Sequence, residues 1–331
     1  MIAPGRAARA LALLMAAWLA VGCGSGGTAT SSSAQPARLR IGVSFDLLNE
    51  IRRAELEVIQ SEARRQNVTV TVVVANNSAD QQRAQIDDLI TGRRVDAIIA
   101  IAQDREKIVS SITQANRAGV PFIAIDRAPA PGGSVAFQIT GDPVADGQLA
   151  GRYLVGLNRP LTVLHLWGAL SDENAVGRRD GFNQAVSGTQ VKIVSQVPTS
   201  WDPHVAGAAT TEALQVHPDL NAIFAPSDFL LPEVAAAVEK AGRTKFADQD
   251  GHIVIVTVDG DPVGCRALAQ GLIDADVATL IGEFGKQAVT AAVRVLHHQP
   301  VSPTVVKVPG LLLDRSNLAA QRSRAWGCQQ V

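Results

Sequence analysis

Residues 96–127 read DAIIAIAQDREKIVSSITQANRAGVPFIAIDR. Two short apolar runs, 96–102 and 121–125, flank a segment, 105–118, whose apolar residues recur at the spacing of one helix face. Strands that are apolar along their whole length are typical of a parallel sheet buried on both faces, with a helix making the crossover between them. This stretch therefore predicts a βαβ unit.

The same alternation extends along the chain in both directions from this unit. Strands are predicted at 40–45, 68–75, 161–166, 191–197, 222–225 and 253–258, and helices at 50–65, 79–90, 173–186, 205–216, 232–241 and 263–271. The pattern restarts after Asp142. Two halves of about 120 residues each favour two doubly wound α/β lobes with parallel sheets over a single closed barrel.

The composition is that of a folded protein with more than one core. The chain has 331 residues, 47% of them hydrophobic, which is enough for two ordinary domains. Its 30 Lys and Arg against 31 Asp and Glu lack the basic excess of a nucleic-acid-binding protein, so no nucleic acid is expected as a partner. Three cysteines and six scattered histidines are too few for a disulfide scaffold or a zinc cluster, and no metal or cofactor is expected.

The first residues have the pattern of an export signal. Arg6 and Arg9 precede an apolar run at 10–21. That run has 12 residues, fewer than the about 20 that a membrane-spanning helix needs. Residues 1–22 are therefore predicted to be a secretory signal peptide.

The run ends in Leu19-Ala20-Val21-Gly22-Cys23, which resembles the lipobox of bacterial lipoproteins. The leucine stands one place further from Cys23 than is usual. The small, polar stretch that follows predicts a flexible tether, so that 23–37 would be a lipidated cysteine and its linker. The alternative is an ordinary cleaved signal with an incidental cysteine.

Export also bears on Cys265 and Cys328. Outside the cytoplasm they could form a disulfide, or they could be two buried free thiols that act as small apolar side chains. The sequence leaves both interpretations open.

Polar residues stand directly after several predicted strands. In open α/β sheets a ligand binds beyond the carboxyl ends of the strands. With two lobes, both sets of loops can face one cleft, which predicts a ligand site there. The residues in question are Asp46, Asp126, Arg127, Ser227, Asp228 and Asp259.

The order of these landmarks resembles the periplasmic sugar-binding proteins of ABC transporters, of the ribose/xylose-binding type, over about residues 38–308. The stretches that carry the resemblance are 40–46 with Arg52, 79–90 followed by 96–101, 119–127, 223–228 and 258–262. The resemblance implies a type I periplasmic-binding fold whose two lobes are joined by three hinge crossovers. It divides the chain into a first lobe of 38–140 plus 280–303 and a second of 141–279 plus 304–331. Cys265 and Cys328 would share the second lobe, which favours their pairing.

The resemblance also implies how a sugar would be held. Carboxylates and guanidinium groups bind its hydroxyls, and an aromatic ring covers its C–H face. Asp126 and Arg127 would be the central pair, and Trp201 the stacking ring. The full expected ligand-binding set is Asp46, Arg52, Asp126, Arg127, Asp142, Asn174, Trp201, Ser227, Asp259 and Thr279.

Several of these residues have a purely structural alternative. Asp142 is suited to cap a helix that begins near Pro143. Arg52 and Asn174 could lie on solvated helix faces, and Trp201 could pack between the lobes. Asp126 and Arg127 could form a local ion pair that stabilises the hinge.

Two positions depart from the family pattern. Ser227 stands where the family has Asn, and Thr279 stands where it has Gln or Lys. Smaller side chains at two contact points leave room for a larger or different ligand. The sequence therefore leaves the particular sugar open.

The implied function is a lipid-anchored, monomeric solute-binding protein of the cell envelope. It would capture a monosaccharide or similar polyol and deliver it to an ABC permease and its ATPase. The alternatives are a sensor that passes its closed state to a membrane receptor or kinase, and a protein that binds a non-sugar molecule. An enzyme is not expected, because the chain has no G-x-S-x-G, P-loop, H-E-x-x-H or C-x-x-C motif.

Overall fold

The computed structural model describes residues 38–329 apart from 171 and 248. In these residues the strands form two separate six-stranded sheets, each with helices on both faces. The sequence prediction of two doubly wound lobes is confirmed, and a single barrel is excluded. The signal peptide, Cys23 and the tether lie outside the described residues.

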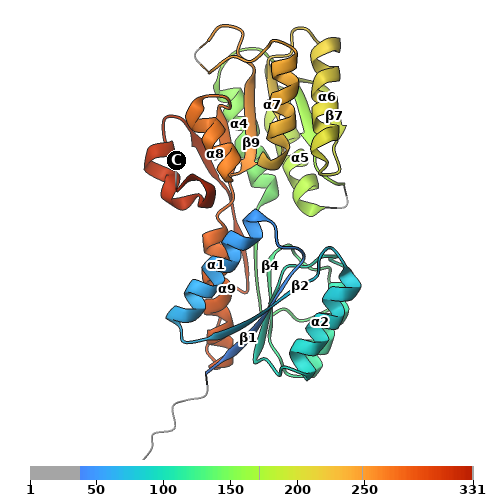
Figure 1. Cartoon of the computed structure of the whole chain (residues 1–331), viewed down its shortest axis with the longest axis vertical. Helices are drawn as coiled ribbons and strands as arrows, with labels where there is room; N and C mark the ends of the chain where they lie inside the picture. Colours follow the sequence, from blue (N-terminus) through green and yellow to red (C-terminus); the bar gives the residue numbers. More distant parts are fainter. Residues whose placement is uncertain (1–37, 171, 248, 330–331) are drawn as a thin grey trace, which may run out of the picture. The chain divides into compact units, whose positions relative to one another are not determined.

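The first sheet has the order β11-β5-β4-β3-β1-β2, and all neighbouring strands in it are parallel. Successive side chains of a strand point to opposite faces, so each strand packs against both helix layers. Ile41 and Val43 pack with α1 and α9, whereas Ile98 packs with α2 and α3. Figure 1 shows α1 and α9 side by side on one face of this sheet and α2 on the other. The elements are β1 (Arg40–Phe45), β2 (Thr69–Val74), β3 (Ala97–Ala100), β4 (Phe122–Asp126), β5 (Phe137–Gly141), β11 (Val305–Val308), α1 (Glu50–Arg65), α2 (Ala79–Thr91), α3 (Ile108–Arg117) and α9 (Ile281–Leu296).

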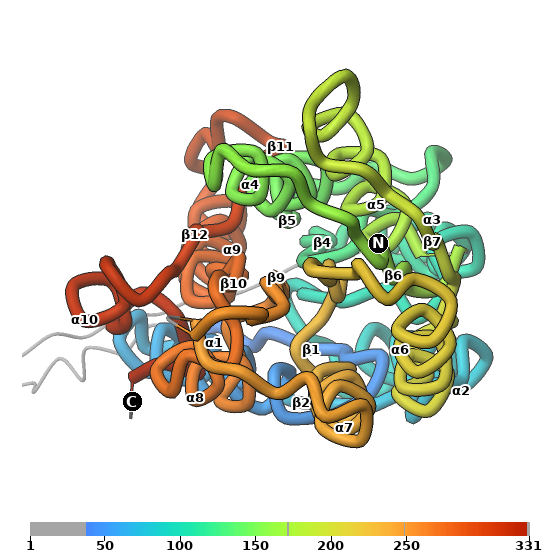
Figure 2. Tube along the Cα trace, turned by 90° about the horizontal axis from the view of Figure 1, so that it is seen from above, coloured from blue at the N-terminus to red at the C-terminus, as the bar shows by residue number. Residues whose placement is uncertain are grey.

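The second sheet has the order β12-β10-β9-β8-β6-β7, in which only the edge strand β12 is antiparallel to its neighbour. Helices α4 and α5 cover one face, and α6, α7 and α8 cover the other (Figure 2). The backbones of α4 and α5 touch, because a Cβ on Gly147 or Gly181 would lie 2.1 or 2.0 Å from a carbonyl oxygen of the facing helix. The elements are β6 (Leu161–Trp167), β7 (Val191–Pro198), β8 (Ala222–Phe224), β9 (Val254–Asp259), β10 (Ala275–Ala278), β12 (Leu311–Asp314), α4 (Pro143–Gly156), α5 (Glu173–Val186), α6 (Pro203–Val216), α7 (Leu231–Lys240) and α8 (Pro262–Gln270).

Helices α6 and α8 begin one or two residues earlier than the sequence periodicity predicts. In α6 and α8 a proline occupies the first turn, directly after an aspartate whose carboxylate accepts backbone N–H groups. These caps are Asp202 and Asp261. Proline is favourable there because the first helical N–H has no intrahelical partner to lose.

The chain passes between the sheets three times, at 142, 279–280 and 309–310. The position of the third crossing corrects the predicted boundary between the lobes. The prediction assigned residues 304–331 to the second lobe. Val305–Val308 instead pairs in parallel with β5 at the edge of the first sheet. This strand is short and half-exposed, so its sequence carries no signal for one sheet over the other.

Candidate functional site

The first group of polar residues lies at the carboxyl ends of β1 and β4. Asn49 accepts the backbone N–H of Arg52 and so begins α1 just beyond β1. This places the Arg52 guanidinium between two carboxylates, with Nε 3.3 Å from Asp46 Oδ1 and Nη2 2.5 Å from Asp126 Oδ2. Arg127 Nη1 lies 3.0 Å from the other oxygen of Asp46. The structure thus brings together the four first-lobe residues named from the sequence.

A tight turn lets two consecutive residues reach this group. Asp126 has a φ of 62°, in the left-handed region, and the N–H of Arg127 donates to the carbonyl of Ile125 at 2.7 Å. Such a backbone costs about 1–3 kcal/mol for a non-glycine residue and persists where the surrounding structure enforces it. It allows Asp126 to contact Arg52 while Arg127 contacts Asp46.

Glu55 is a further member of this group that sequence reasoning missed. Its carboxylate is fully buried and accepts from Arg52 Nη1 at 3.2 Å. The other oxygen, Oε1, has no hydrogen-bond partner among the described residues. The spacing of three residues from Arg52 on one helix is a signal that could have found it.

Burial and charge act in opposite directions on these carboxyl groups. Burial raises the pKa of Glu55 to about 8, although the charge of Arg52 opposes it. Burial also disfavours the charged form of Asp126, but Arg52 and Arg127 outweigh it, and the pKa of Asp126 lies below its usual range. Arg52 is therefore the charge that keeps the group compatible with burial.

The second group lies at the carboxyl ends of β8 and β9. Asp259 ends β9, and the Ser227 hydroxyl donates to its Oδ2. Arg178 Nη2 donates to Asp259 Oδ1 at 3.0 Å, and its Nη1 donates to the carbonyl of Pro226 at 2.7 Å.

Arg178 is the second residue that sequence reasoning missed. It is only 7% exposed and lies one turn along α5 from Asn174, on the same helix face. It stands next to Arg179, and the two arginines cannot be told apart in the sequence. The charge of Arg178 also helps to lower the pKa of Asp126, so the two groups interact across the lobes.

A cavity of about 480 Å³ is lined from both lobes, and of the ten expected ligand-binding residues Arg127 and Trp201 line it. That volume is within the range of about 300–1,000 Å³ typical of small-molecule sites. Trp201 lies in its wall, where its indole Nε1 donates to Asp172 at 3.1 Å. The lining residues include Gln103, Asp104, Arg105, Arg127, Asp172 and Trp201.

The ring of Trp201 is held by a close approach to Gly168. A Cβ on residue 168 would lie 2.1 Å from Trp201 Cζ2, so any larger residue must displace the ring. Gly168→Ala is expected to weaken binding of a ligand that contacts Trp201 by about tenfold, the equivalent of roughly 1.4 kcal/mol. Calorimetric titration of this variant, and of Gly156→Ala as a control with open space at its Cβ, measures the effect. Unchanged affinity in Gly168→Ala would remove Trp201 from the binding surface.

The remaining predicted residues are arranged less uniformly. Asp142 caps α4 by accepting the N–H of Ala145 at 3.2 Å. Helix capping is the structural role that the sequence offered as the alternative to ligand binding. Asn174 lines a smaller cavity of about 40 Å³ together with Asp126 and Arg127. Thr279 follows β10 and donates its N–H to the carbonyl of Asp259, while its hydroxyl has no partner among the described residues.

Three more carboxyl groups, those of Asp228, Asp261 and Asp276, surround the turn after Asp259. Burial raises the pKa of Asp276 to about 7, and the charge of Asp259 adds to this. Burial likewise raises the pKa of Asp228, with the charge of Asp276 as the next cause. Two such carboxyl groups side by side favour a shared proton over two charges.

Asp276→Asn is expected to change how stability depends on pH. A buried carboxyl whose pKa rises from 3.8 to about 7 binds its proton more tightly when folded, so stability falls as pH rises between these values. The loss reaches about 1.4 kcal/mol per pH unit. Asparagine carries no charge, so this variant should gain stability over wild type at pH 7.5 and little at pH 4.

Urea unfolding across that pH range gives the comparison, with the exposed Asp250→Asn as control. Parallel pH profiles for wild type and Asp276→Asn would contradict the assignment.

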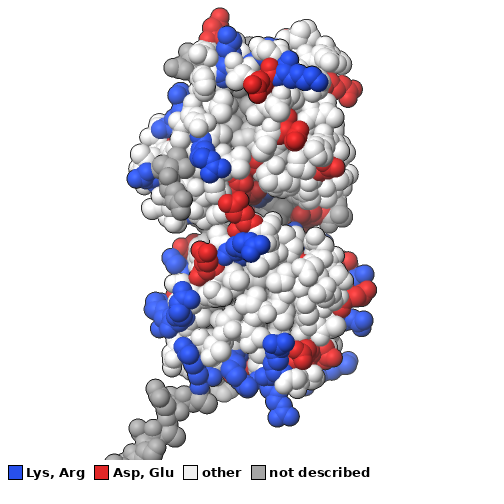
Figure 3. Space-filling view, in the orientation of Figure 1, with Lys and Arg blue, Asp and Glu red and all other residues white. Residues whose placement is uncertain are grey.

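Other properties of the described part also bear on function. Within it, no group of His, Cys, Asp or Glu has the arrangement of a metal site. None of its helices combines the length and the apolar character needed to cross a membrane. On the face drawn in Figure 3, Lys and Arg are interspersed with Asp and Glu between wide uncharged areas.

Comparison with known proteins agrees with this geometry. Residues 42–300 match the family described as a periplasmic binding protein domain. The ribose import binding protein of Escherichia coli (strain K12) is 28% identical over 243 residues, which cover 73% of this chain and 79% of the relative.

Solved structures of solute-binding proteins share this fold. A periplasmic solute-binding protein of an ABC transporter from Actinobacillus succinogenes 130z, with bound D-allose, superposes with a TM-score of 0.77 at 23% identity, over 84% of this chain and 98% of that one. An ABC transporter solute-binding protein from Mycobacterium smegmatis with bound glycerol reaches 0.75 at 26% identity, over 86% and 96%. Taken with the two wound sheets and the charged groups at their carboxyl edges, the match over 42–300 means that this chain belongs to the periplasmic binding protein domain family.

Proposed function

We propose that the chain captures a monosaccharide or similar polyol between its two lobes and delivers it to an ABC importer. The observation that carries this is a cavity lined from both lobes, with Arg127 and Trp201 in its wall and a buried charged group at the carboxyl edge of each sheet. Carboxylate and guanidinium groups held at fixed positions suit the vicinal hydroxyls of a sugar. The chain is not an enzyme, since its family consists of binding proteins.

The relatives support the ligand class and the partners. The ribose import protein of E. coli takes part in import of its sugar, and the two solved proteins belong to ABC transporters. By analogy, the partners of this chain are a permease and its ATPase. Ser227 and Thr279, which are smaller than the family residues, are proposed as the positions that set which sugar fits.

A thermal-shift screen of the purified protein tests the proposal. The probes are D-ribose, D-allose, other pentoses and hexoses, myo-inositol, glycerol and nucleosides. A probe present at 100 times its dissociation constant adds about 2.7 kcal/mol of stability. One strong sugar hit, bound one per monomer in calorimetry, supports the proposal. A hit confined to nucleosides, or none at all, rejects the sugar assignment.

The delivery step needs its own measurement. Deletion of the gene should abolish uptake of the radiolabelled sugar hit, and compaction in small-angle scattering should accompany binding as the lobes close. Normal uptake in the deletion strain would reject import and support a sensory role for the sugar-bound form.

We also propose that the mature protein is exported and anchored by a lipid on Cys23, on the basis of the run 19–23. Wild-type protein should then fractionate with membranes, and Cys23→Ser protein should not. An intact mass that shows no lipid on the wild-type protein would reject the anchor.

A further inference from the structure

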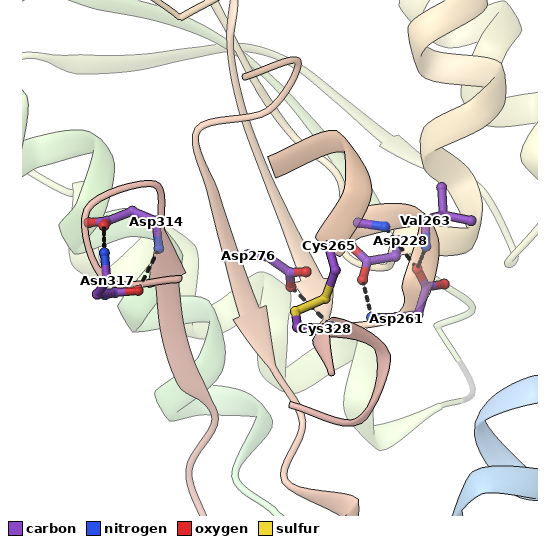
Figure 4. Close-up of a disulfide and its surroundings, with 10 residues drawn as sticks. Asp228, Asp261, Val263, Cys265, Asp276, Asp314, Asn317 and Cys328 are labelled. Carbon is purple, nitrogen blue, oxygen red and sulfur yellow. Dashed lines mark hydrogen bonds between the residues drawn. A yellow bond between two sulfur atoms is a disulfide. The ribbon is translucent and has the colours of Figure 1, made fainter. Parts of the chain in front are cut away.

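The C-terminal segment 315–329 is joined to the second lobe by a disulfide. Cys265 on α8 is bonded to Cys328, and both side chains are fully buried (Figure 4). The two residues are 63 positions apart in the sequence. After β12 ends, the segment contains only the four-residue helix α10 (Leu318–Gln321) and two short 3₁₀ turns. Such short helices are not stable by themselves, so the position of this segment depends on the disulfide and on its contacts with the second lobe.

Residues 325–328, at the disulfide-bonded end of this segment, contact the turn 259–261. The N–H of Gly327 donates to the carbonyl of Gly260 at 3.1 Å. A Cβ on Gly327 would lie 2.2 Å from the carbonyl carbon of Asp261, so the two backbones are in contact. Asp259, which pairs with Arg178, is the first residue of that turn.

Buried acids hold the backbone N–H groups of the same turn. The N–H of Gly260 donates to Asp276 at 3.1 Å, and the N–H of Asp261 donates to Asp228 at 2.8 Å. Figure 4 shows Asp228 and Asp276 close to the disulfide, with Asp261 beside them. The acids therefore fix the N–H groups of the turn, and the C-terminal segment fixes its carbonyl.

The turn requires such support because its backbone is strained. Asp259 has a φ of 122° and Gly260 a φ of 67°. A non-glycine residue in this region persists only when surrounding contacts enforce it. A released turn would relax and move the Asp259 carboxylate away from Arg178.

We propose that the disulfide-anchored segment is a positioning element of the ligand site, in which the Cys265–Cys328 bond clamps residues 325–328 onto the turn that carries Asp259. The inference rests on the proposed function for its effect on sugar affinity. Its effect on the turn itself is independent of any ligand. Loss of the clamp weakens binding through misplacement of Asp259, while the sheet of the second lobe stays folded.

Two variants of the purified protein release the clamp in different ways. Cys265→Ala together with Cys328→Ala removes the bond, and alanine suits the buried positions. Gly327→Ala keeps the bond but forces the segment off the turn through the backbone overlap. Matched controls are Asn317→Ala, which loosens the same segment at a turn away from 259–261, and Gly156→Ala.

Amide hydrogen exchange gives the readout that needs no ligand. The amides of Gly260 and Asp261 should exchange about tenfold faster in both clamp variants, the equivalent of roughly 1.4 kcal/mol of local opening. Amides in the middle of β9, such as Val256, should keep the wild-type rate, and both controls should match wild type at Gly260, Asp261 and Val256. Equal rates at Gly260 and Asp261 in wild type and in the clamp variants would overturn the proposal.

Calorimetry with D-ribose, D-allose or whichever sugar gives the largest thermal shift supplies the second readout. The clamp variants should bind it about tenfold more weakly, and the controls as wild type does. If wild-type protein binds no sugar, the proposed function fails while the exchange experiment still decides the clamp. If wild type binds and the clamp variants bind equally well, the clamp fails and the function stands.

Discussion

Arg52→Met is expected to abolish measurable sugar binding and to lower the free energy of unfolding by about 3–5 kcal/mol. The guanidinium is the shared partner of three carboxylates, those of Asp46, Glu55 and Asp126, and its side chain is 8% exposed. Methionine fills much of the volume but leaves Glu55 and Asp126 without an ion-pair partner among the described residues, while Asp46 keeps Arg127. Removing one member of a buried ion pair is costly because the remaining charge stays desolvated.

The pH dependence of this variant distinguishes lost charge from lost packing. Without Arg52 the pKa of Glu55 rises further and the pKa of Asp126 rises from below its usual range, so the folded state of the variant binds protons more tightly. Stability of Arg52→Met should therefore recover in part as pH falls from 7.5 to 5, which urea titrations at the two pH values measure. A pH-independent loss would show that packing, and not charge, is what Arg52 contributes.

Arg53→Met is the matched control, since Arg53 is the adjacent, exposed residue of α1. It should bind sugar as wild type does and change the free energy of unfolding by no more than about 0.5 kcal/mol. If both variants behave alike, the buried group at the end of β1 is not part of the site.

Arg178→Met is expected to raise the dissociation constant for the sugar at least about a hundredfold, the equivalent of roughly 2.7 kcal/mol. Arg178 donates hydrogen bonds to Asp259 and to the carbonyl of Pro226. From the other lobe, its charge also lowers the pKa of Asp126. Without it, Asp259 keeps the Ser227 hydroxyl as its side-chain partner but no neutralising charge. The free energy of unfolding should fall by about 2–4 kcal/mol, less than for Arg52, because Asp259 is partly open to solvent.

The neighbouring Arg179 again provides the control. Its guanidinium pairs with Asp180 and lies over the ring of Trp167, 5.1 Å from the centroid, away from Asp259. Arg179→Met should leave sugar affinity unchanged in the same calorimetric titration. Retained affinity in Arg178→Met would show that Asp259 binds without its buried partner and would remove Arg178 from the site.

Local sequence was sufficient to predict most of the secondary structure and the edge at which the site lies. Runs such as Phe122–Ile125 are apolar throughout because both sheet faces are covered, and the polar residue that ends each run marks the carboxyl edge. Caps such as Asp261-Pro262 act within one helical turn. Signals of this kind depend on neighbours a few residues away, so they can be recognised in a single sequence.

Contacts between distant segments were decided only by the tertiary structure. The sequence of β11 is compatible with either sheet. The structure pairs it with β5, which precedes it by more than 160 residues in the sequence. Arg178 and Arg179 look alike in sequence, yet only the former faces Asp259, 81 residues away. The pairing of Cys265 with Cys328 and the burial of Glu55 likewise depend on which elements pack together.

The chain therefore determined by itself its strands, its helices and the polar residues available at the strand ends. The tertiary structure decided which of those residues face one another, since a pairing depends on the packing of sheets and helices and has no local pattern. Asp142 is the case in which both interpretations were visible in the sequence, and the fold places its carboxylate on the first turn of α4.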